Sequence, residues 1–145
     1  MKFLRSESET SRYGRGLART LRPGDVVLLL GDLGSGKTTL TKGVARGLGI
    51  RTPITSPTFV LRKRYALPHP VRGIRFLNHV DAYRLGDAKE FRGVLDQMIA
   101  AATDEVWCIE WGGKIRSALQ SAKTRLIRLR VVDSLTRAVT GRLVK

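Results

Sequence analysis

The chain of 145 residues has a single cysteine, Cys108, and this scarcity excludes an intramolecular disulfide. A chain without disulfides is typical of a reducing compartment. No run of about 18 apolar residues occurs, and the first residues lack the apolar segment of a secretory leader. The sequence therefore predicts a cytoplasmic protein with no membrane association. Within the apolar run from Val106 to Ile109, we expect the thiol of Cys108 to be buried and unreactive.

Acidic residues are also scarce, since 12 Asp and Glu face 27 Lys and Arg, which gives a formal net charge of +15. A positive field of this size attracts nucleic acid or an acidic partner. However, no aromatic-rich RNA-binding motif accompanies the charge, and scattered arginines can also reflect the composition of the source genome. The composition therefore leaves tRNA or another polyanion open as a partner.

The remaining composition is that of an ordinary globular protein, with 42% hydrophobic and 27% charged residues. The length suits one hydrophobic core and is too short for two ordinary domains. We therefore predict a single domain over residues 1–145.

A glycine-rich loop directly follows the apolar run from Val26 to Leu30. Residues 31–38 fill every position of the Walker A pattern, with a strand expected before the loop and an amphipathic helix after it. Glycines allow backbone N–H groups to point at a phosphate, and the following helix adds its positive dipole end. We expect Lys37 to bind the outer phosphates and the Thr38 hydroxyl to bind Mg²⁺. The predicted nucleotide-binding residues of this loop are Gly31, Gly34, Ser35, Gly36, Lys37, Thr38 and Thr39.

Hydrophobic periodicity predicts alternating helices and strands along the chain. A first helix is expected over 8–21, with Ser8 or Thr10 as its N-cap. A second helix is expected where Leu40, Val44 and Leu48 recur, and a third begins at a capping box formed by Asp87 and Glu90. The signal for a helix over 114–121 is weak. Strands are expected at 26–30 and 106–109, with hairpins formed by 59–61 and 74–77 and by 124–132 and 136–144. The first hairpin should turn at the segment containing Pro68, Pro70 and Gly73. The pattern favours an α/β fold, a three-layer P-loop NTPase-like sandwich with a mixed parallel and antiparallel central sheet.

Two carboxylates fall at expected strand ends, where ligands bind in open α/β sheets. Glu110 ends the strand from Val106 and is the first candidate for the magnesium shell, and Asp81 is the candidate for positioning water or binding the metal. Alternatively, either carboxylate caps a helix or pairs with an arginine. We interpret His79 as a hydrogen-bonded structural residue. Trp111 either lies near the nucleotide, contacts a partner or packs against the sheet edge.

Four motifs in this order, at residues 31–39, 56–59, 79–85 and 109–111, closely resemble the bacterial TsaE (YjeE) family. Its members are small P-loop ATPases that support threonylcarbamoyl modification of the tRNA adenosine beside the anticodon. The resemblance implies ATP and Mg²⁺ as cofactors and the TsaD and TsaB-like proteins of the modification complex as partners. It also implies that Thr10 lies near the nucleotide base, that Thr58 senses the outer phosphate, that Asp81 and Glu110 are the site carboxylates, and that Trp111 lies beside them. The chain departs from the family at Gly112 to Lys114, where members commonly have an acid.

The leading hypothesis is an ATPase, weak alone and stimulated by partners, that drives or resets a tRNA-modifying complex. A small P-loop kinase is the alternative, although no arginine-rich insertion supplies a lid. A GTPase is disfavoured because an Asn-Lys-x-Asp guanine-reading motif is absent. The net charge also allows a nucleic-acid-binding module that uses the loop for backbone phosphate.

Overall fold

The computed structural model describes residues 1–57, 61–83, 89–111, 115–116, 119 and 123–144. Its centre is a seven-stranded sheet in the order β1-β7-β6-β2-β5-β4-β3. The strands are β1 (Lys2–Leu4), β2 (Val26–Leu30), β3 (Arg62–Val71), β4 (Ile74–Asp81), β5 (Glu105–Glu110), β6 (Thr124–Val131) and β7 (Arg137–Val144). The helices are α1 (Glu7–Ala18), α2 (Lys37–Gly47) and α3 (Lys89–Ala101).

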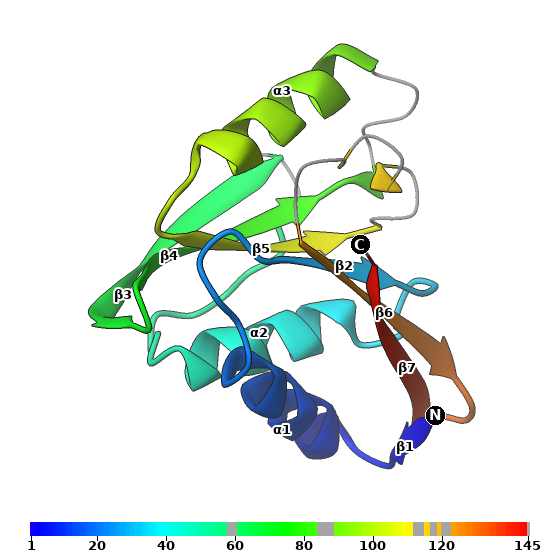
Figure 1. Ribbon diagram of the computed structural model, residues 1–145. Coiled ribbons are helices and arrows are strands. Elements are labelled where there is room, and N and C mark those ends of the chain that lie inside the picture. The colour runs from blue at the N-terminus through cyan, green and yellow to red at the C-terminus, as the bar shows by residue number, and fades with distance from the viewer. Residues whose placement is uncertain (58–60, 84–88, 112–114, 117–118, 120–122, 145) are drawn as a thin grey trace.

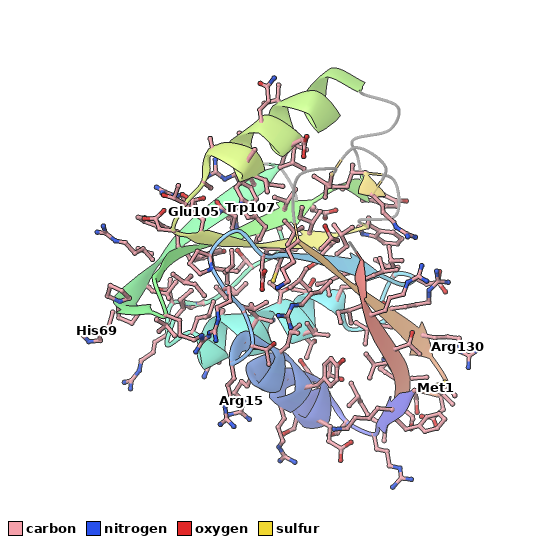
Figure 2. All side chains as sticks on the ribbon, in the orientation of Figure 1. Met1, Arg15, His69, Glu105, Trp107 and Arg130 are labelled. Atoms are coloured by element: carbon pink, nitrogen blue, oxygen red, sulfur yellow. The ribbon has the colours of Figure 1, made fainter. Side chains whose placement is uncertain are left out.

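The helices cover both faces of this sheet, α1 and α2 on one face and α3 on the other (Figure 1). The alternation of side chains along β2 serves both layers, because Val27 and Leu29 join the core beneath α1 and α2 while Val26 and Leu28 join the core with α3. On the α3 face, Trp107 of β5 fills the space between sheet and helix (Figure 2). The predicted three-layer α/β sandwich with a mixed sheet, of the P-loop NTPase type, is therefore confirmed.

Four neighbouring strands run parallel and bring their carboxyl ends to one edge of the sheet. β2 pairs in parallel with both β5 and β6, and β5 pairs in parallel with β4. In this register Glu110 is opposite Leu29 on one side and Asp81 on the other. Because β2 ends at Leu30, the glycine loop begins at the same edge as both predicted site carboxylates.

Glycines allow α1 and α2 to pack with their backbones in contact. A Cβ on Gly14 would lie 2.3 Å from the Leu40 carbonyl oxygen, and a Cβ on Gly43 would lie 2.2 Å from the Ser11 carbonyl oxygen. Neither distance can accommodate a side chain without moving a helix. Glycine normally weakens the interior of a helix, whereas Gly14 is here the point at which the two helices make contact.

The N-cap of α1 is Ser6, so the predictions of Ser8 and Thr10 were wrong. Ser6 Oγ accepts a hydrogen bond from the Glu9 backbone N–H at 3.1 Å, and Glu9 Oε2 accepts one from the Arg5 N–H at 2.7 Å. A serine followed three residues later by a glutamate is a capping-box signature, and it outcompetes the later hydroxyls. The helix also ends at Ala18, earlier than the predicted residue 21.

The first hairpin has longer strands than predicted, and its turn occupies only the last part of the segment predicted to contain it. β3 runs through Pro68 and Pro70, and the turn lies at Arg72 and Gly73, whose φ angles are +51° and +83°. Prolines fit here because β3 is the edge strand of the sheet, where a missing N–H need not break the ladder. Of the strand predicted over 59–61, residues 59 and 60 lie outside the described part of the chain, and Leu61 precedes β3.

The other predicted elements have mixed outcomes. The closing hairpin is confirmed as β6 and β7, while the short β1, which pairs antiparallel with β7, was not predicted. The predicted helix over 114–121 falls largely outside the described residues, as does Asp87 of the predicted capping box. Among the described residues, no helix is long and apolar enough to cross a membrane.

Candidate functional site

The glycine loop connects β2 to α2 and leaves the start of the helix open to a ligand. Gly34 and Gly36 have φ angles of +73° and +98°, which non-glycine residues rarely adopt. A Cβ on Gly31 would lie 2.3 Å from the Leu129 carbonyl oxygen of β6, so this position also requires glycine. Gly36 is the N-cap of α2 and offers no side-chain acceptor to the N–H groups of the first turn. Such a helix start favours an anion.

Lys37 lies in the mouth of this loop. Its Nζ donates to the carbonyl oxygens of Gly31 at 2.7 Å and Asp32 at 2.8 Å, and only 5% of the residue is exposed. Burial lowers the pKa of Lys37, and the nearby carboxylates of Glu110, Asp81 and Asp32 partly oppose this shift. The hydrogen bonds of the ammonium are to neutral oxygens, so a bound phosphate would be a stronger, charged partner.

A buried hydrogen-bonded cluster surrounds the Glu110 carboxylate at the end of β5. Oε1 of Glu110 accepts from Thr38 Oγ1 at 2.8 Å and lies 2.8 Å from His79 Nε2. Glu110 is 4% exposed and His79 is fully buried, so neither group exchanges its partner for bulk water. An N–H on His79 Nε2 would donate to the Glu110 carboxylate, which accepts hydrogen bonds when it is ionised. The interpretation of His79 as a hydrogen-bonded structural residue is confirmed, and its partner is a candidate site carboxylate.

The donor set of this cluster fits magnesium. Thr38 and Glu110 bring a hydroxyl and a carboxylate oxygen together, the hard ligands that Mg²⁺ prefers. Within the described residues, no group of three or more His, Cys, Asp and Glu could hold a metal ion. This protein donor set therefore suits an ion that takes the rest of its shell from phosphate and water.

The end of β4 contributes Asp81 and Tyr83 beside this cluster. Asp81 Oδ1 accepts from the Tyr83 backbone N–H at 2.9 Å, and the Tyr83 and Trp111 ring centroids are 4.8 Å apart. Trp111 follows β5 with a φ of +60°, and its ring centroid lies 3.9 Å from Lys37 Nζ. Trp111 lines the cavity beside the glycine loop and also packs against the α3-side core, so both the position near the site and the packing on the sheet that were considered for it are present.

Two cavities flank the glycine loop and share Gly34, Gly36 and Thr39 in their walls. The first, of about 360 Å³, brings together the predicted Lys37, Thr38, Asp81, Glu110 and Trp111. The second, of about 300 Å³, is lined by Thr10 and Glu7 of α1, by Ser134 and Leu135 of the turn between β6 and β7, and by Arg137 of β7. The loop thus separates an acidic compartment, which contains the candidate metal ligands Thr38 and Glu110, from a second compartment that contains Thr10.

Comparison with known proteins identifies the family. The family model described as threonylcarbamoyl adenosine biosynthesis protein TsaE matches residues 4–139. The chain belongs to the TsaE family. It is 45% identical over 120 residues to the tRNA threonylcarbamoyladenosine biosynthesis protein TsaE of Streptomyces coelicolor, covering 81% of this chain and 75% of the relative. It is 40% identical over 136 residues to the protein of that name from Treponema pallidum, covering 94% and 95%.

A solved structure supports the same assignment. The crystal structure of Bacillus subtilis YdiB superposes with a TM-score of 0.75 at 31% identity, covering 99% of this chain and 84% of the other. The TsaE family resemblance inferred from four sequence motifs is therefore confirmed, and it extends across most of the chain.

Some residues that line the second compartment of this TsaE family member were not predicted from the sequence. Glu7 and the turn at Ser134 and Leu135 were missed, because residues near α1 and β7 meet the loop only once the strand order is known. Arg137 Nη2 donates to the Gly34 carbonyl oxygen at 3.2 Å, which ties β7 to the loop. Thr58 lies outside the described residues, but Ser56 of the same motif lines the first cavity.

Proposed function

We propose that this TsaE family member binds and hydrolyses ATP with magnesium and so drives or resets the assembly that makes threonylcarbamoyladenosine in tRNA. One observation carries the proposal. At a single sheet edge, the buried Lys37 in the glycine loop lies beside the pair formed by Thr38 and Glu110. A cation for phosphate and oxygen ligands for magnesium are the groups that phosphoryl transfer from a nucleotide requires.

The two compartments suggest how the nucleotide is oriented. The phosphates would lie against the glycine loop, with Lys37 on their outer oxygens, and the nucleoside would extend toward Thr10 and Arg137. When bound, magnesium neutralises charge on the phosphate oxygens, and Thr38 and Glu110 would hold it. Asp81 borders the same cavity and would position the attacking water or complete the metal site. Trp111 would cover the phosphate side and limit access of bulk water.

The partners follow from the family and from energetics. The relatives are named as tRNA threonylcarbamoyladenosine biosynthesis proteins, so TsaD and TsaB-like components in the cytoplasm are the proposed partners. Hydrolysis does useful work only if a partner binds the ATP and ADP states with different affinity. We therefore propose feeble turnover by the isolated chain and stimulation by the complex.

The assignment of Lys37 is tested by ATP titration in a calorimeter. Replacing Lys37 with Ala should abolish measurable ATP binding, because the loop then has no cation for the outer phosphates. Lys42→Ala is the matched control, since Lys42 is an exposed lysine on the same helix, and its ATP affinity should equal that of the wild type. Unchanged affinity in Lys37→Ala would remove the proposed role of the loop.

The same variant separates the alternatives. A nucleic-acid-binding module that uses the loop for backbone phosphate would lose RNA affinity in Lys37→Ala. A kinase would form ADP only if an acceptor substrate were added and would transfer the phosphoryl group to that acceptor, whereas the proposed enzyme forms ADP and inorganic phosphate from ATP and water.

A further inference from the structure

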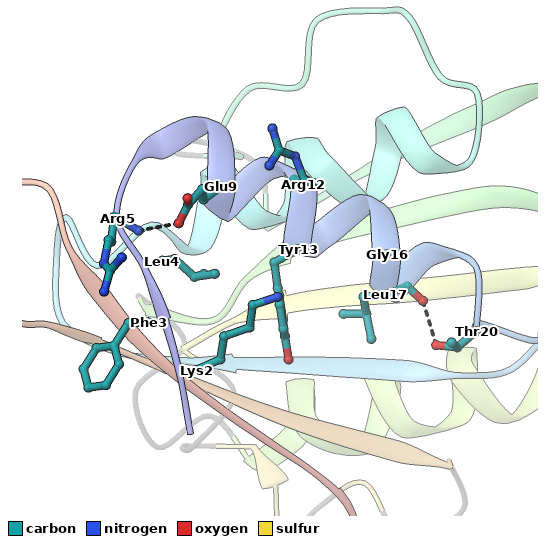
Figure 3. A pocket seen from close by; sticks show the side chains of 10 residues that line it. All are labelled: Lys2, Phe3, Leu4, Arg5, Glu9, Arg12, Tyr13, Gly16, Leu17 and Thr20. Atoms are coloured by element: carbon teal, nitrogen blue, oxygen red, sulfur yellow. Dashed lines mark hydrogen bonds between the residues drawn. The ribbon is translucent and has the colours of Figure 1, made fainter.

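A groove beside α1 lies apart from both compartments of the nucleotide site. Its first part is a cavity of about 680 Å³ between β1 and α1 (Figure 3). Its second part, of about 330 Å³, lies between α1 and the strands β6 and β7. The two parts share Tyr13 and Leu17 as a common wall, and none of their residues lines either compartment beside the glycine loop. We call their union the α1 groove.

Cations line the α1 groove without matching acids. Lys2 and Arg12 line the first part, and Lys123 and Arg142 line the second. Within the described part of the chain, none of these four side chains forms an ion pair with a carboxylate. The acid in the wall, Glu9, accepts a hydrogen bond from the Arg5 backbone N–H and so caps α1 (Figure 3). The groove therefore holds positive charge that the protein itself does not neutralise.

Another cation, Arg125 in the second part of the groove, is neutralised by the protein itself. Arg125 donates to the Thr20 carbonyl oxygen at 2.8 Å and to Asp25 Oδ2 at 3.3 Å, so its guanidinium is held by the protein. Lys123 is two residues away and exposed, with no such partner among the described residues. Arg125 is therefore paired with a carboxylate, whereas other cations of the groove, such as Lys123, are not paired within the part of the chain that the structure describes.

The floor of the groove is apolar and aromatic. Tyr13 is half-buried, and Lys2 Nζ lies 6.0 Å from its ring centroid (Figure 3). Gly141 of β7 faces the Tyr13 hydroxyl, because a Cβ built on that glycine would lie 3.4 Å from the oxygen. An aromatic side chain at the floor, with lysine and arginine at the rim, suits a ligand in which flat rings that can stack are joined by negatively charged groups.

We propose that the α1 groove binds RNA through its phosphodiester backbone, with Lys2, Arg12, Lys123 and Arg142 binding the phosphates. Arginine and lysine bind phosphate strongly, and the net charge of +15 favours association of the whole protein with a polyanion. An acidic peptide would pair with the cations at the rim, but its carboxylate side chains would not stack on the aromatic floor. The identification of the RNA as tRNA rests on the proposed function. The contacts proposed for the groove itself are with phosphate groups of any RNA.

The test measures binding of a fluorescently labelled tRNA transcript by anisotropy over a series of salt concentrations. The variant Arg12→Glu/Lys123→Glu reverses one exposed cation in each part of the groove. We expect its affinity at low salt to fall roughly tenfold or more, and the slope of log K against log salt to become shallower by about 0.7 for each phosphate that the variant no longer binds. Arg46→Glu/Arg51→Glu is the matched control, because it changes net charge equally at exposed positions outside the groove.

The controls separate this inference from the ATPase proposal. Lys37→Ala should retain tRNA binding while losing ATP, so that failure of one proposal leaves the other standing. An equal loss in both double variants would overturn the groove as a site and assign the effect to net charge alone. Undiminished tRNA affinity in Arg12→Glu/Lys123→Glu, with association to the TsaD and TsaB-like proteins abolished, would overturn RNA in favour of a protein surface.

Discussion

Glu110 is the residue at which the candidate site is assembled. Thr38 from the start of α2 and His79 from β4 both contact its Oε1 atom, so three elements meet at one oxygen. Because Glu110 is buried, its carboxylate depends on these partners for stabilisation. The orientation of a proposed magnesium ligand is therefore set by a histidine that would not itself touch the metal.

Replacing His79 with Phe tests this positioning role. The change keeps an aromatic ring of similar size in a buried position but removes the hydrogen bond, which typically contributes about 1.5–3 kcal/mol when one partner is charged. We expect partner-stimulated ATP hydrolysis to fall while ATP affinity changes little. His69→Phe, at an exposed position of β3, is the control for introducing the ring. Normal hydrolysis by His79→Phe would show that Thr38 alone orients Glu110.

Cys108 gives a second prediction at the residue scale. The residue is fully buried in β5, and burial, with a smaller contribution from Glu110, raises the pKa of its thiol to about 12. A thiol reagent at neutral pH should therefore leave the native protein unlabelled and react only after unfolding in urea. Rapid labelling of the folded protein would contradict the interpretation of Cys108 as an inert core residue.

At the scale of elements, the packing of α1 on α2 makes a prediction with an internal control. Gly14→Ala would place a Cβ 2.3 Å from the Leu40 carbonyl oxygen, whereas a Cβ on Gly16 meets nothing within 4 Å. We expect Gly14→Ala to lower the free energy of unfolding by at least about 1–3 kcal/mol. Gly16→Ala should instead raise it by roughly 0.5–1 kcal/mol through helix propensity. Urea denaturation measures both, and equal effects would show that the helices do not pack as described.

Sequence patterns predicted the elements whose signals are local and long. The strand at 26–30 is a continuous apolar run and the helix that follows the loop has apolar residues at a helical period, and both form. β1 was missed because three residues cannot display a period of two. The extent of β3 was missed because the tolerance of Pro68 and Pro70 depends on its place at the sheet edge, which no local pattern encodes.

For the whole molecule, the acidic side of the site was predictable, whereas only part of the second compartment was, namely Thr10 through the family resemblance and the residues of the glycine loop. The rule that ligands bind at the carboxyl ends of parallel strands was enough to select Asp81 and Glu110. The approach of Arg137 to the glycine loop instead requires β6 to lie beside β2, with β7 next to β6. That order is a property of the complete sheet, so periodicity along the chain could not supply it.

The coupling of ATP hydrolysis by this chain to a larger assembly is the central claim at the same scale. It is tested most directly by the rate of magnesium-dependent ATP hydrolysis, measured for the wild type and for Glu110→Gln with and without the TsaD and TsaB-like partners. We predict slow hydrolysis by the wild type alone, clear stimulation by the partners, and a steep loss in Glu110→Gln although that variant still binds ATP. Turnover near roughly 10 per second by the isolated wild type, a typical rate for an independent enzyme, or near-normal turnover by Glu110→Gln would contradict the account.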